Sequence, residues 1–315
     1  PADQRHIAGF VVNKFRGDLR LLAPGLGMLE SMTGRPTLGV LPWLKDLWLD
    51  AEDSLDLDSR PRAALPPHGP ASLRVTVVRL PRMSNVTDVD PLAAEPGVIV
   101  DLATTPAHLE GADLVILPGT RATVSDLGWL RESGLAAAVT DRAARGLPVL
   151  GICGGYQMLA RSIHDEVESR AGTVPGLGLL PATVSFGAAK TLARPSGTAL
   201  GEAVAGYEIH HGTVTASGGE PFLDGCSAGP VRGTTWHGIF ENDGFRRAFL
   251  RDLAGRRGRD FIPAPGVSFA AVRERRYELL ADMIGEHLDT GALGSLIDGG
   301  VPTGLPTLVS GLARG

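Results

Sequence analysis

Apolar residues occur in short runs along this chain, and the runs alternate with segments of helical periodicity. The runs at 7–12 and 37–41 flank a segment, 21–34, whose apolar residues recur at helical spacing and which ends at a glycine. This order predicts strand, helix and strand, the βαβ unit of a parallel sheet. We expect residues 1–59 to be the C-terminal portion of a larger α/β domain.

The same alternation begins again further along the chain. Helical periodicity over 129–146 separates the last two of four near-continuous apolar runs, which lie at 73–78, 98–102, 113–117 and 147–152. Strands that are apolar throughout are typical of a parallel sheet covered by helices on both faces, so we expect a doubly wound α/β sheet. Three later runs predict a more antiparallel continuation, at 182–186, 206–215 and 231–236.

Changes in composition suggest where the chain divides. The acidic segment 45–59 is typical of a solvated surface, and the four prolines within 60–72 predict a linker. We expect the second domain to cover 73–257. An amphipathic helix over 268–288 belongs to the C-terminal helical segment that we expect at 258–297, and the glycine-rich 298–315 predicts a flexible tail.

Bulk composition excludes several classes of protein. The hydrophobic fraction is 43%, the charged fraction is 21% and the mean hydropathy is +0.08, which is typical of a globular protein. The net charge of −5 and the absence of a basic run argue against a nucleic-acid partner. No apolar stretch reaches the ~18 residues of a membrane span and the first residues do not resemble a signal peptide, so we expect a cytoplasmic setting without a membrane partner.

Cys153 lies in GLPVLGICGGYQMLA, between a predicted strand and a predicted helix. A sharp strand-to-helix turn strains the backbone of its central residue, and flanking glycines remove side chains that would clash. A helix N-terminus also favours the thiolate. We predict that Cys153 is a nucleophile, the alternative being a buried structural cysteine. Cys226, the only other cysteine, forms no CxxC spacing with it, so we expect no metal site.

A nucleophilic thiol needs a group to move its proton. His237 follows an apolar run and precedes a glycine, the same strand-end position as Cys153, so we predict that it is the general base. The adjacent pair His210 and His211 competes for that role, and a purely structural histidine remains an alternative.

Several residues near the predicted strand ends are candidates for binding. Amides beside Gly119, in LVILPGT, and at Gly154 are candidate oxyanion donors for acyl chemistry. A polar cluster after the strand at 73–78 and two residues of GYEIHHG are candidate substrate contacts, although a capped loop would look the same in sequence: Arg82, Ser84, Asn85, Asp88, Glu208 and His210.

The ordered motifs ILPGT, GICGGYQML and WHGIF resemble the class I glutamine amidotransferases, which release ammonia from L-glutamine through a cysteine thioester. The resemblance implies that Gln157, four residues after the nucleophile, helps to hold glutamine. Most members carry Glu two positions after the histidine, where this chain has Ile239. That lack is typical of the cobyrinate-amidating branch. It leaves open which group orients His237, with Glu241 as a weak candidate.

Longer motifs, among them GFVVNKFRGD, VVRLPRMSNVTDVDPL and GYEIHHG, resemble the cobyric acid synthase branch of that family over nearly the whole chain. The resemblance implies amidation of the b, d, e and g carboxylates of adenosylcobyrinic acid a,c-diamide, a step of cobalamin biosynthesis. ATP and Mg²⁺ would be co-substrates in a dethiobiotin-synthetase-like domain, and no tightly bound cofactor is expected. Asn13 is a candidate contact for the nucleotide base.

These residues contain no P-loop, so we expect most of the ATP site to lie outside them and this part to carry the glutaminase half. Three alternatives stay open. The sibling cobyrinic acid a,c-diamide synthases usually have an acidic residue where this chain has Ile152. The others are an amidoligase acting on another acid and a non-catalytic binding module. The sequence leaves the oligomeric state open.

Overall fold

The structure is a computed structural model that describes residues 3–44 and 65–307. Its contacts divide the chain into two compact units, Pro1–Leu47 with Arg273–Gly315, and Trp48–Val272. The acidic segment 45–59 lies outside the described residues, as do the first part of the expected linker and the last part of the expected tail. Each unit is described by itself.

The first unit contains the predicted βαβ arrangement. Strands β1 (Phe10–Phe15) and β2 (Thr37–Pro42) pair in parallel, and α1 (Leu19–Thr33) connects them. Asp18 caps the start of α1 by accepting from the amide of Arg20, and Gly34 ends it with a φ of 63°. The strand–helix–strand prediction is confirmed. The unit also contains η1 (Asp3–His6), α8 (Thr290–Gly299) and most of α7 (Phe269–His287).

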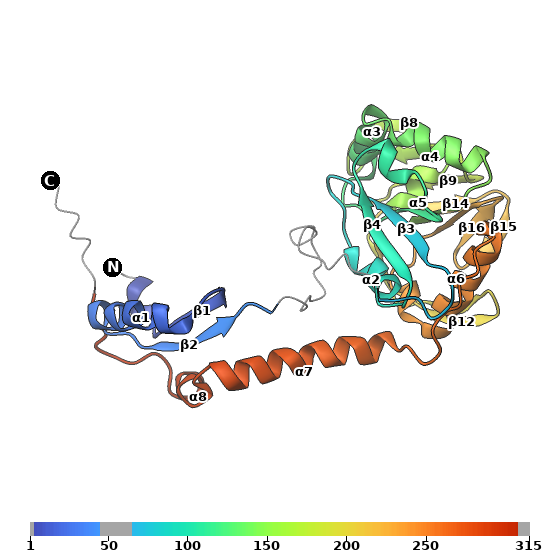
Figure 1. The fold of residues 1–315 in the computed structure, drawn as a ribbon. Helices are drawn as coiled ribbons and strands as arrows, with labels where there is room; N and C mark the ends of the chain where they lie inside the picture. The colour runs from blue at the N-terminus through green and yellow to red at the C-terminus, as the bar shows by residue number, and fades with distance from the viewer. Residues whose placement is uncertain (1–2, 45–64, 308–315) are drawn as a thin grey trace. The chain divides into compact units, whose positions relative to one another are not determined.

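The second unit is built on a seven-stranded sheet, and Figure 1 shows β3 and β4 side by side at one of its edges. The strands β4, β3, β5, β6 and β17 are parallel, and β16 and β15 continue the sheet antiparallel. In sheet order these are β15 (Glu220–Phe222), β16 (Gly225–Ala228), β17 (Val231–Thr234), β6 (Val149–Ile152), β5 (Leu114–Leu117), β3 (Leu73–Val78) and β4 (Val98–Ala103). The predicted parallel sheet is confirmed. The prediction of an antiparallel continuation was wrong for the run at 231–236, because β17 pairs in parallel with β6, and the antiparallel strands of this sheet, β15 and β16, lie outside the predicted runs.

Smaller sheets extend the second unit beside the carboxyl end of β6. A four-stranded sheet has the order β14 (Thr213–Ala216), β9 (Ala182–Ser185), β7 (Ser162–Asp165), β8 (Gly172–Pro175). Two antiparallel ribbons join β10 (Thr191–Ala193) to β13 (Glu208–His210) and β11 (Ser196–Ala199) to β12 (Glu202–Ala205). These ribbons place β13 beside the end of the main sheet, since Tyr207 forms a bridge with His237.

The helices of the second unit lie between and around the strands. The predicted helix over 129–146 is instead two helices, α3 (Thr123–Glu132) and α4 (Leu135–Ala144), because Gly134 adopts a φ of 77° that ends the helical path. The other helical elements are η3 (Val86–Val89), α2 (Asp90–Ala93), η4 (Pro106–Leu109), α5 (Gly154–Leu159), η5 (Ile239–Glu241) and α6 (Asp243–Arg257). None of the described helices is long and apolar enough to cross a membrane.

A buried ion pair lies within the core of this unit. Arg246 of α6 and Glu95 are both fully buried, with 3.0 Å between Nε and Oε2. Arg246 also contacts Asp243 and donates to the carbonyl of Phe240, while Glu95 accepts from the amide of Ala264. The pair therefore joins α6 to the segments of Glu95 and Ala264, which lie outside the helices and strands. The buried Glu95 carboxylate depends on the charge of Arg246 for compensation.

We expect Arg246→Met to lower the free energy of unfolding by about 3–5 kcal/mol, because it leaves the Glu95 carboxylate buried without its counter-charge. The matched control is Arg145→Met, which removes an exposed pair with Asp141 and should cost at most about 0.5 kcal/mol. Urea unfolding followed by circular dichroism measures both. Similar losses in the two variants would contradict a structural role for the buried pair.

Candidate functional site

Cys153 occupies the turn between β6 and α5, at the carboxyl end of the central parallel strands. Its backbone has a φ of 50° and a ψ of −111°, an unusual conformation for a residue with a side chain. The turn is tight because α5 approaches the sheet closely: a Cβ atom on Gly155 would come within 1.9 Å of the carbonyl oxygen of Leu117. Only glycine fits at position 155. Cys153, two residues earlier in the same turn, is the strained residue that carries the thiol.

His237 follows β17, separated from it by Thr235 and Trp236, and is completely buried. Its backbone exchanges hydrogen bonds in both directions with Tyr207, whose ring stacks on the imidazole at 5.2 Å between centroids. On another side Gly119 packs against the ring, and a Cβ atom there would come within 2.9 Å of Cε1 of His237. The imidazole is therefore held by a backbone bridge, an aromatic ring and a glycine.

Both nitrogens of the His237 ring have polar partners. Nδ1 lies 2.6 Å from Oδ2 of Asp88, and the other oxygen of that carboxylate accepts from the amide of Gly238 at 2.7 Å. Nε2 lies 3.0 Å from the side-chain amide of Asn85, and the ring also hydrogen-bonds Cys153. The acid at the ring is thus Asp88 from the loop after β3, and not the Glu241 that the sequence offered.

These neighbours shift the protonation of His237. Burial favours the neutral ring and by itself lowers the pKa of His237, but the charges of Asp88 and Cys153 and their hydrogen bonds raise it. The net result is a pKa well above the ordinary value. The Asp88 carboxylate stabilises the protonated ring, so His237 is suited to take the proton of the thiol.

The loop after β5 places a backbone amide beside Gly154. The carbonyl of Gly119 accepts from the amide of Ser84 at 2.9 Å. In a trans peptide the N–H of the next residue points the opposite way, so the amide of Thr120 faces away from Ser84. A Cβ atom on Gly154 would lie 3.0 Å from that nitrogen. The amides of Gly154 and Thr120 therefore lie close together, and the predicted amide beside Gly119 is that of Thr120.

A cavity of about 400 Å³ opens beside the thiol. Its inner part is lined by Cys153 and by polar residues from the surrounding loops, namely Ser84, Asn85, Thr120, Thr123 and Gln157. The side-chain carbonyl of Gln157 accepts from the hydroxyl of Thr123, and its amide donates to the backbone carbonyl of His211. Gln157 thus fixes the 211–212 loop against α5.

The outer part of the same cavity contains charges of both signs. It is lined by Arg121, Glu168 and Lys190 together with Phe186, Ile209, His210 and His211. Glu168 belongs to a turn that the buried carboxylate of Asp165 holds, since it accepts from the amides of Val167, Glu168 and Ser169. Burial and the charge of Asp165 raise the pKa of Glu168, and His211 opposes them. Sequence reasoning missed Glu168, which no local motif distinguishes from other surface acids.

The remaining sequence candidates lie around this cavity or away from it. The guanidinium of Arg82 bonds Ser125 and lies 3.7 Å from Asp126, which braces the loop containing Thr120. Glu208 accepts from the hydroxyl of Thr235, and its Oε1 lies 3.7 Å from Nε2 of His210.

Asn13 belongs to the first unit, where it is exposed on β1. Its neighbours Lys14 and Arg16 lie over the ring of Trp43, the latter at 3.9 Å from the ring centroid. The carboxyl ends of β1 and β2 thus bring together two cations and an aromatic ring.

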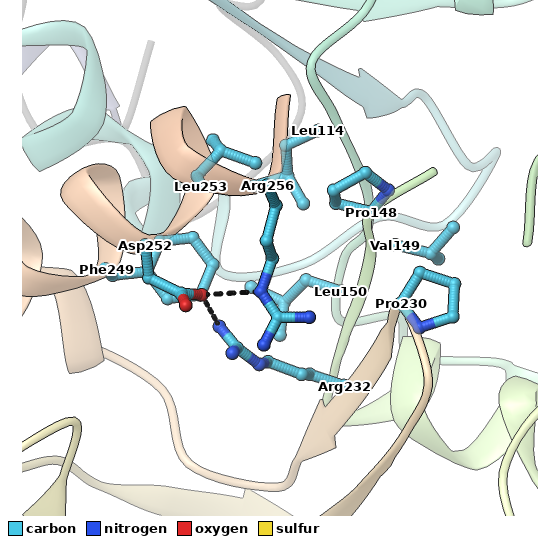
Figure 2. Close-up of a pocket in the computed structure, with 10 residues that line it drawn as sticks. All are labelled: Leu114, Pro148, Val149, Leu150, Pro230, Arg232, Phe249, Asp252, Leu253 and Arg256. Carbon is cyan, nitrogen blue, oxygen red and sulfur yellow. Dashed lines mark hydrogen bonds and ion pairs between the residues drawn. The ribbon is translucent and has the colours of Figure 1, made fainter. Parts of the chain in front are cut away.

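A second, much smaller pocket of about 10 Å³ is shown in Figure 2. It lies at the amino ends of the strands, where Leu114 begins β5, Pro148 precedes β6 and Pro230 precedes β17. The carboxylate of Asp252 bridges Arg232 and Arg256 across it (Figure 2). The pocket is at the opposite end of the sheet from the thiol.

We expect the free energy of unfolding to fall as the pH rises from about 6.5 through the raised pKa of His237. A raised pKa in the folded state gives stability that is fully present below the unfolded value and is lost as the pH passes the folded value. Urea unfolding between pH 6 and pH 9 measures this slope, and His237→Gln should make it shallower. Identical slopes in the two proteins would show that His237 does not titrate as described.

Comparisons with known proteins agree with this architecture. Residues 74–245, more than half of the chain, match the model of the CobB/CobQ-like glutamine amidotransferase domain. Cobyric acid synthase from Streptomyces avermitilis is 57% identical over 98% of this chain, and the enzyme from Streptomyces coelicolor is 58% identical over 99%. The chain spans 62% and 63% of the length of these two relatives.

A solved glutamine amidotransferase is 24% identical, with a TM-score of 0.47, and the match covers 57% of this chain and 98% of that protein. The family match includes the strand that precedes the Asp88 loop, the turn that holds Cys153 and the segment that holds His237. The chain therefore belongs to the CobB/CobQ-like glutamine amidotransferase family.

Proposed function

We propose that the second unit hydrolyses the side-chain amide of free L-glutamine and releases ammonia. The observation that carries this proposal is the strained Cys153 hydrogen-bonded to a buried, charge-stabilised His237 at the inner end of a 400 Å³ cavity. A thiol paired with an imidazole in this way is poised for nucleophilic attack on an acyl carbon. Family membership supplies the substrate class.

The reaction begins when Sγ of Cys153 attacks the amide carbon of glutamine and its proton passes to Nε2 of His237. His237 then gives the proton to the leaving nitrogen, the carbon–nitrogen bond breaks, and ammonia leaves a thioester on Cys153. Water next attacks the thioester with His237 again accepting a proton. The products are glutamate and the regenerated thiol, so atoms and charges balance over the cycle.

Each attack places negative charge on the former carbonyl oxygen. The amides of Gly154, at the start of α5, and of Thr120 lie close together beside the thiol, and we propose them as the donors to this oxyanion. Asp126 supports the second donor by accepting from the Thr120 hydroxyl at 2.6 Å. Donors fixed before the reaction stabilise the developing charge without reorganisation.

The outer cavity matches the other end of glutamine. Free glutamine carries an α-ammonium and an α-carboxylate, and the cavity offers the carboxylate of Glu168 together with the cations of Arg121 and Lys190. We propose that Glu168 binds the ammonium and that the two cations bind the carboxylate. Gln157 lies between the two ends and contacts the substrate chain. This arrangement favours the free amino acid over an amide within a protein chain.

Amidation of a second substrate is the further part of the proposal. The relatives are named as cobyric acid synthases, and we propose that the ammonia serves the b, d, e and g carboxylates of adenosylcobyrinic acid a,c-diamide. ATP and Mg²⁺ would activate those carboxylates. Asn13, beside Lys14, Arg16 and Trp43, is a candidate for contact with the nucleotide base. The sibling reaction of cobyrinic acid a,c-diamide synthase is the alternative with the same chemistry.

We expect a glutamine-analogue electrophile to label Cys153 and no other residue, because Cys153 is the cysteine that lines the cavity and hydrogen-bonds His237. Cys153→Ser should abolish both labelling and glutamine hydrolysis. The matched control is Cys226→Ser, since Cys226 is equally buried but contacts the hydroxyl of Tyr156 instead. Mass spectrometry of the labelled peptides identifies the site. Labelling that survives Cys153→Ser would support the non-catalytic alternative.

We expect Glu168→Gln to raise the KM for glutamine by roughly tenfold or more with a smaller change in kcat, because a charge-assisted contact to the ammonium is lost. Glu166→Gln, two residues earlier in the same turn, is the control and should leave both constants near their original values. Steady-state ammonia release measures the two constants. An unchanged KM in Glu168→Gln would remove this residue from the proposed subsite.

A further inference from the structure

The His237 ring is oriented by a carboxylate that its own sequence neighbourhood does not supply. The position two residues after the histidine is Ile239, which has no polar group. We propose that Asp88 is the positioning residue for His237, reaching it from the loop after β3. This inference rests on the proposed function, because it concerns the base of that reaction.

The contact geometry supports this role. The Asp88 carboxylate uses both oxygens on the histidine segment, Oδ2 at 2.6 Å from Nδ1 of His237 and Oδ1 at 2.7 Å from the amide of Gly238. Asp88 is only 3% exposed and His237 is fully buried. A charge-assisted contact removed from water is stronger than one on the surface, and two contacts fix the ring's direction as well as its place.

The same contact fixes the tautomer of the ring. A carboxylate oxygen accepts only, so Nδ1 carries the proton and the neutral ring has its lone pair on Nε2. Nε2 lies 3.0 Å from the side-chain amide of Asn85, and because Asp88 occupies Nδ1, Nε2 is the nitrogen left for the hydrogen bond with Cys153. Asp88 therefore leaves the ring in the form that can accept the proton of Cys153.

Asp88 is held before any substrate binds. It belongs to η3, whose Val86 and Val89 are buried in the core, and its amide donates to the carbonyl of Asn85 at 3.0 Å. Ser84, which precedes Asn85, donates from its amide to the carbonyl of Gly119. The carboxylate is thus attached to the same packed loop that supports the Thr120 amide.

The groups that face His237 come from four segments. Asp88 and Asn85 contact the ring nitrogens, Cys153 hydrogen-bonds the ring, Tyr207 stacks on its face and Gly119 packs against Cε1. Burial raises the pKa of Tyr207, and the charges of Asp88 and Glu241 raise it further, so its hydroxyl stays neutral. Among the described residues that contact a ring nitrogen, Asp88 alone carries a carboxylate.

The test replaces Asp88 by Asn, which keeps the size of the side chain. Asn has one acceptor oxygen where two donors, Nδ1–H and the Gly238 amide, must be satisfied. If its oxygen remains on Gly238, its NH₂ group donates to Nδ1 and forces the proton onto Nε2, where the ring cannot accept from Cys153. We expect kcat for glutamine hydrolysis to fall by roughly 10³–10⁴-fold with KM little changed.

A second readout separates positioning from a structural role. The rate of Cys153 alkylation by iodoacetamide is measured against pH, on the chain as it stands. In Asp88→Asn we expect slower alkylation at neutral pH than in the unsubstituted protein, because Nε2 of His237 then carries a proton and no longer accepts the proton of the thiol. Glu241→Gln is the control for a nearby acid, and its profile should stay close to the original.

The outcomes separate this inference from the proposed function. Equal alkylation rates in the unsubstituted protein and in His237→Gln would overturn the Cys153–His237 pairing itself. A slower rate in His237→Gln that Asp88→Asn does not share would overturn only the role of Asp88. If Asp88→Asn fails to fold, ¹⁵N NMR of the unsubstituted protein decides, recorded above the His237 pKa. A proton on Nδ1 supports the proposal, and a proton on Nε2 alone overturns it.

Discussion

The close approach of α5 to the sheet is the constraint on which the site depends. Leu117 leaves no space for a side chain at Gly155, and Gly233 of β17 packs so tightly under the ring of Tyr156 that a Cβ atom would lie 2.0 Å from it. Because the helix is pressed onto three strands, the residue before it must turn sharply, and that residue is Cys153. The strain at the thiol is stabilised by burial elsewhere, in a core of apolar residues from both faces of the sheet.

Much of the fold follows from the sequence because long apolar runs have few alternatives. The four runs between 73 and 152 become the parallel strands β3, β4, β5 and β6, and the run at 231–236 contains β17. Periodicity could not divide 129–146 into two helices, since the break depends on the single backbone conformation of Gly134. Short strands such as β10 and β11 have mostly exposed residues, so their pairing is set by neighbours that a local pattern does not contain.

The residues of the site also fall into two groups, those that a local sequence signal identifies and those that only a long-range contact identifies. Cys153 and the Gly154 amide could be found from sequence because a strand, a glycine turn and a helix are all local signals. Asp88 was recognised only as one polar residue in a cluster, and its place at the imidazole depends on a contact that spans 149 residues. Glu168 had no signal at all, since its place in the cavity is set by the buried Asp165 beneath its turn. Long-range packing decides which polar groups come into contact. A local motif contains only one partner of such a contact, so it does not predict the pair.

The chain order of the three groups has a consequence for biosynthesis. The acid at position 88 is made first, the thiol at 153 next and the imidazole at 237 last, and the last strand of the parallel set, β17, inserts beside β6 only after more than half of the unit has emerged. Contacts of such sequence separation form late in folding. In a nascent chain that ends before residue 237, Cys153 therefore lacks its imidazole partner. The pairing of the thiol with the ring depends on completion of the sheet.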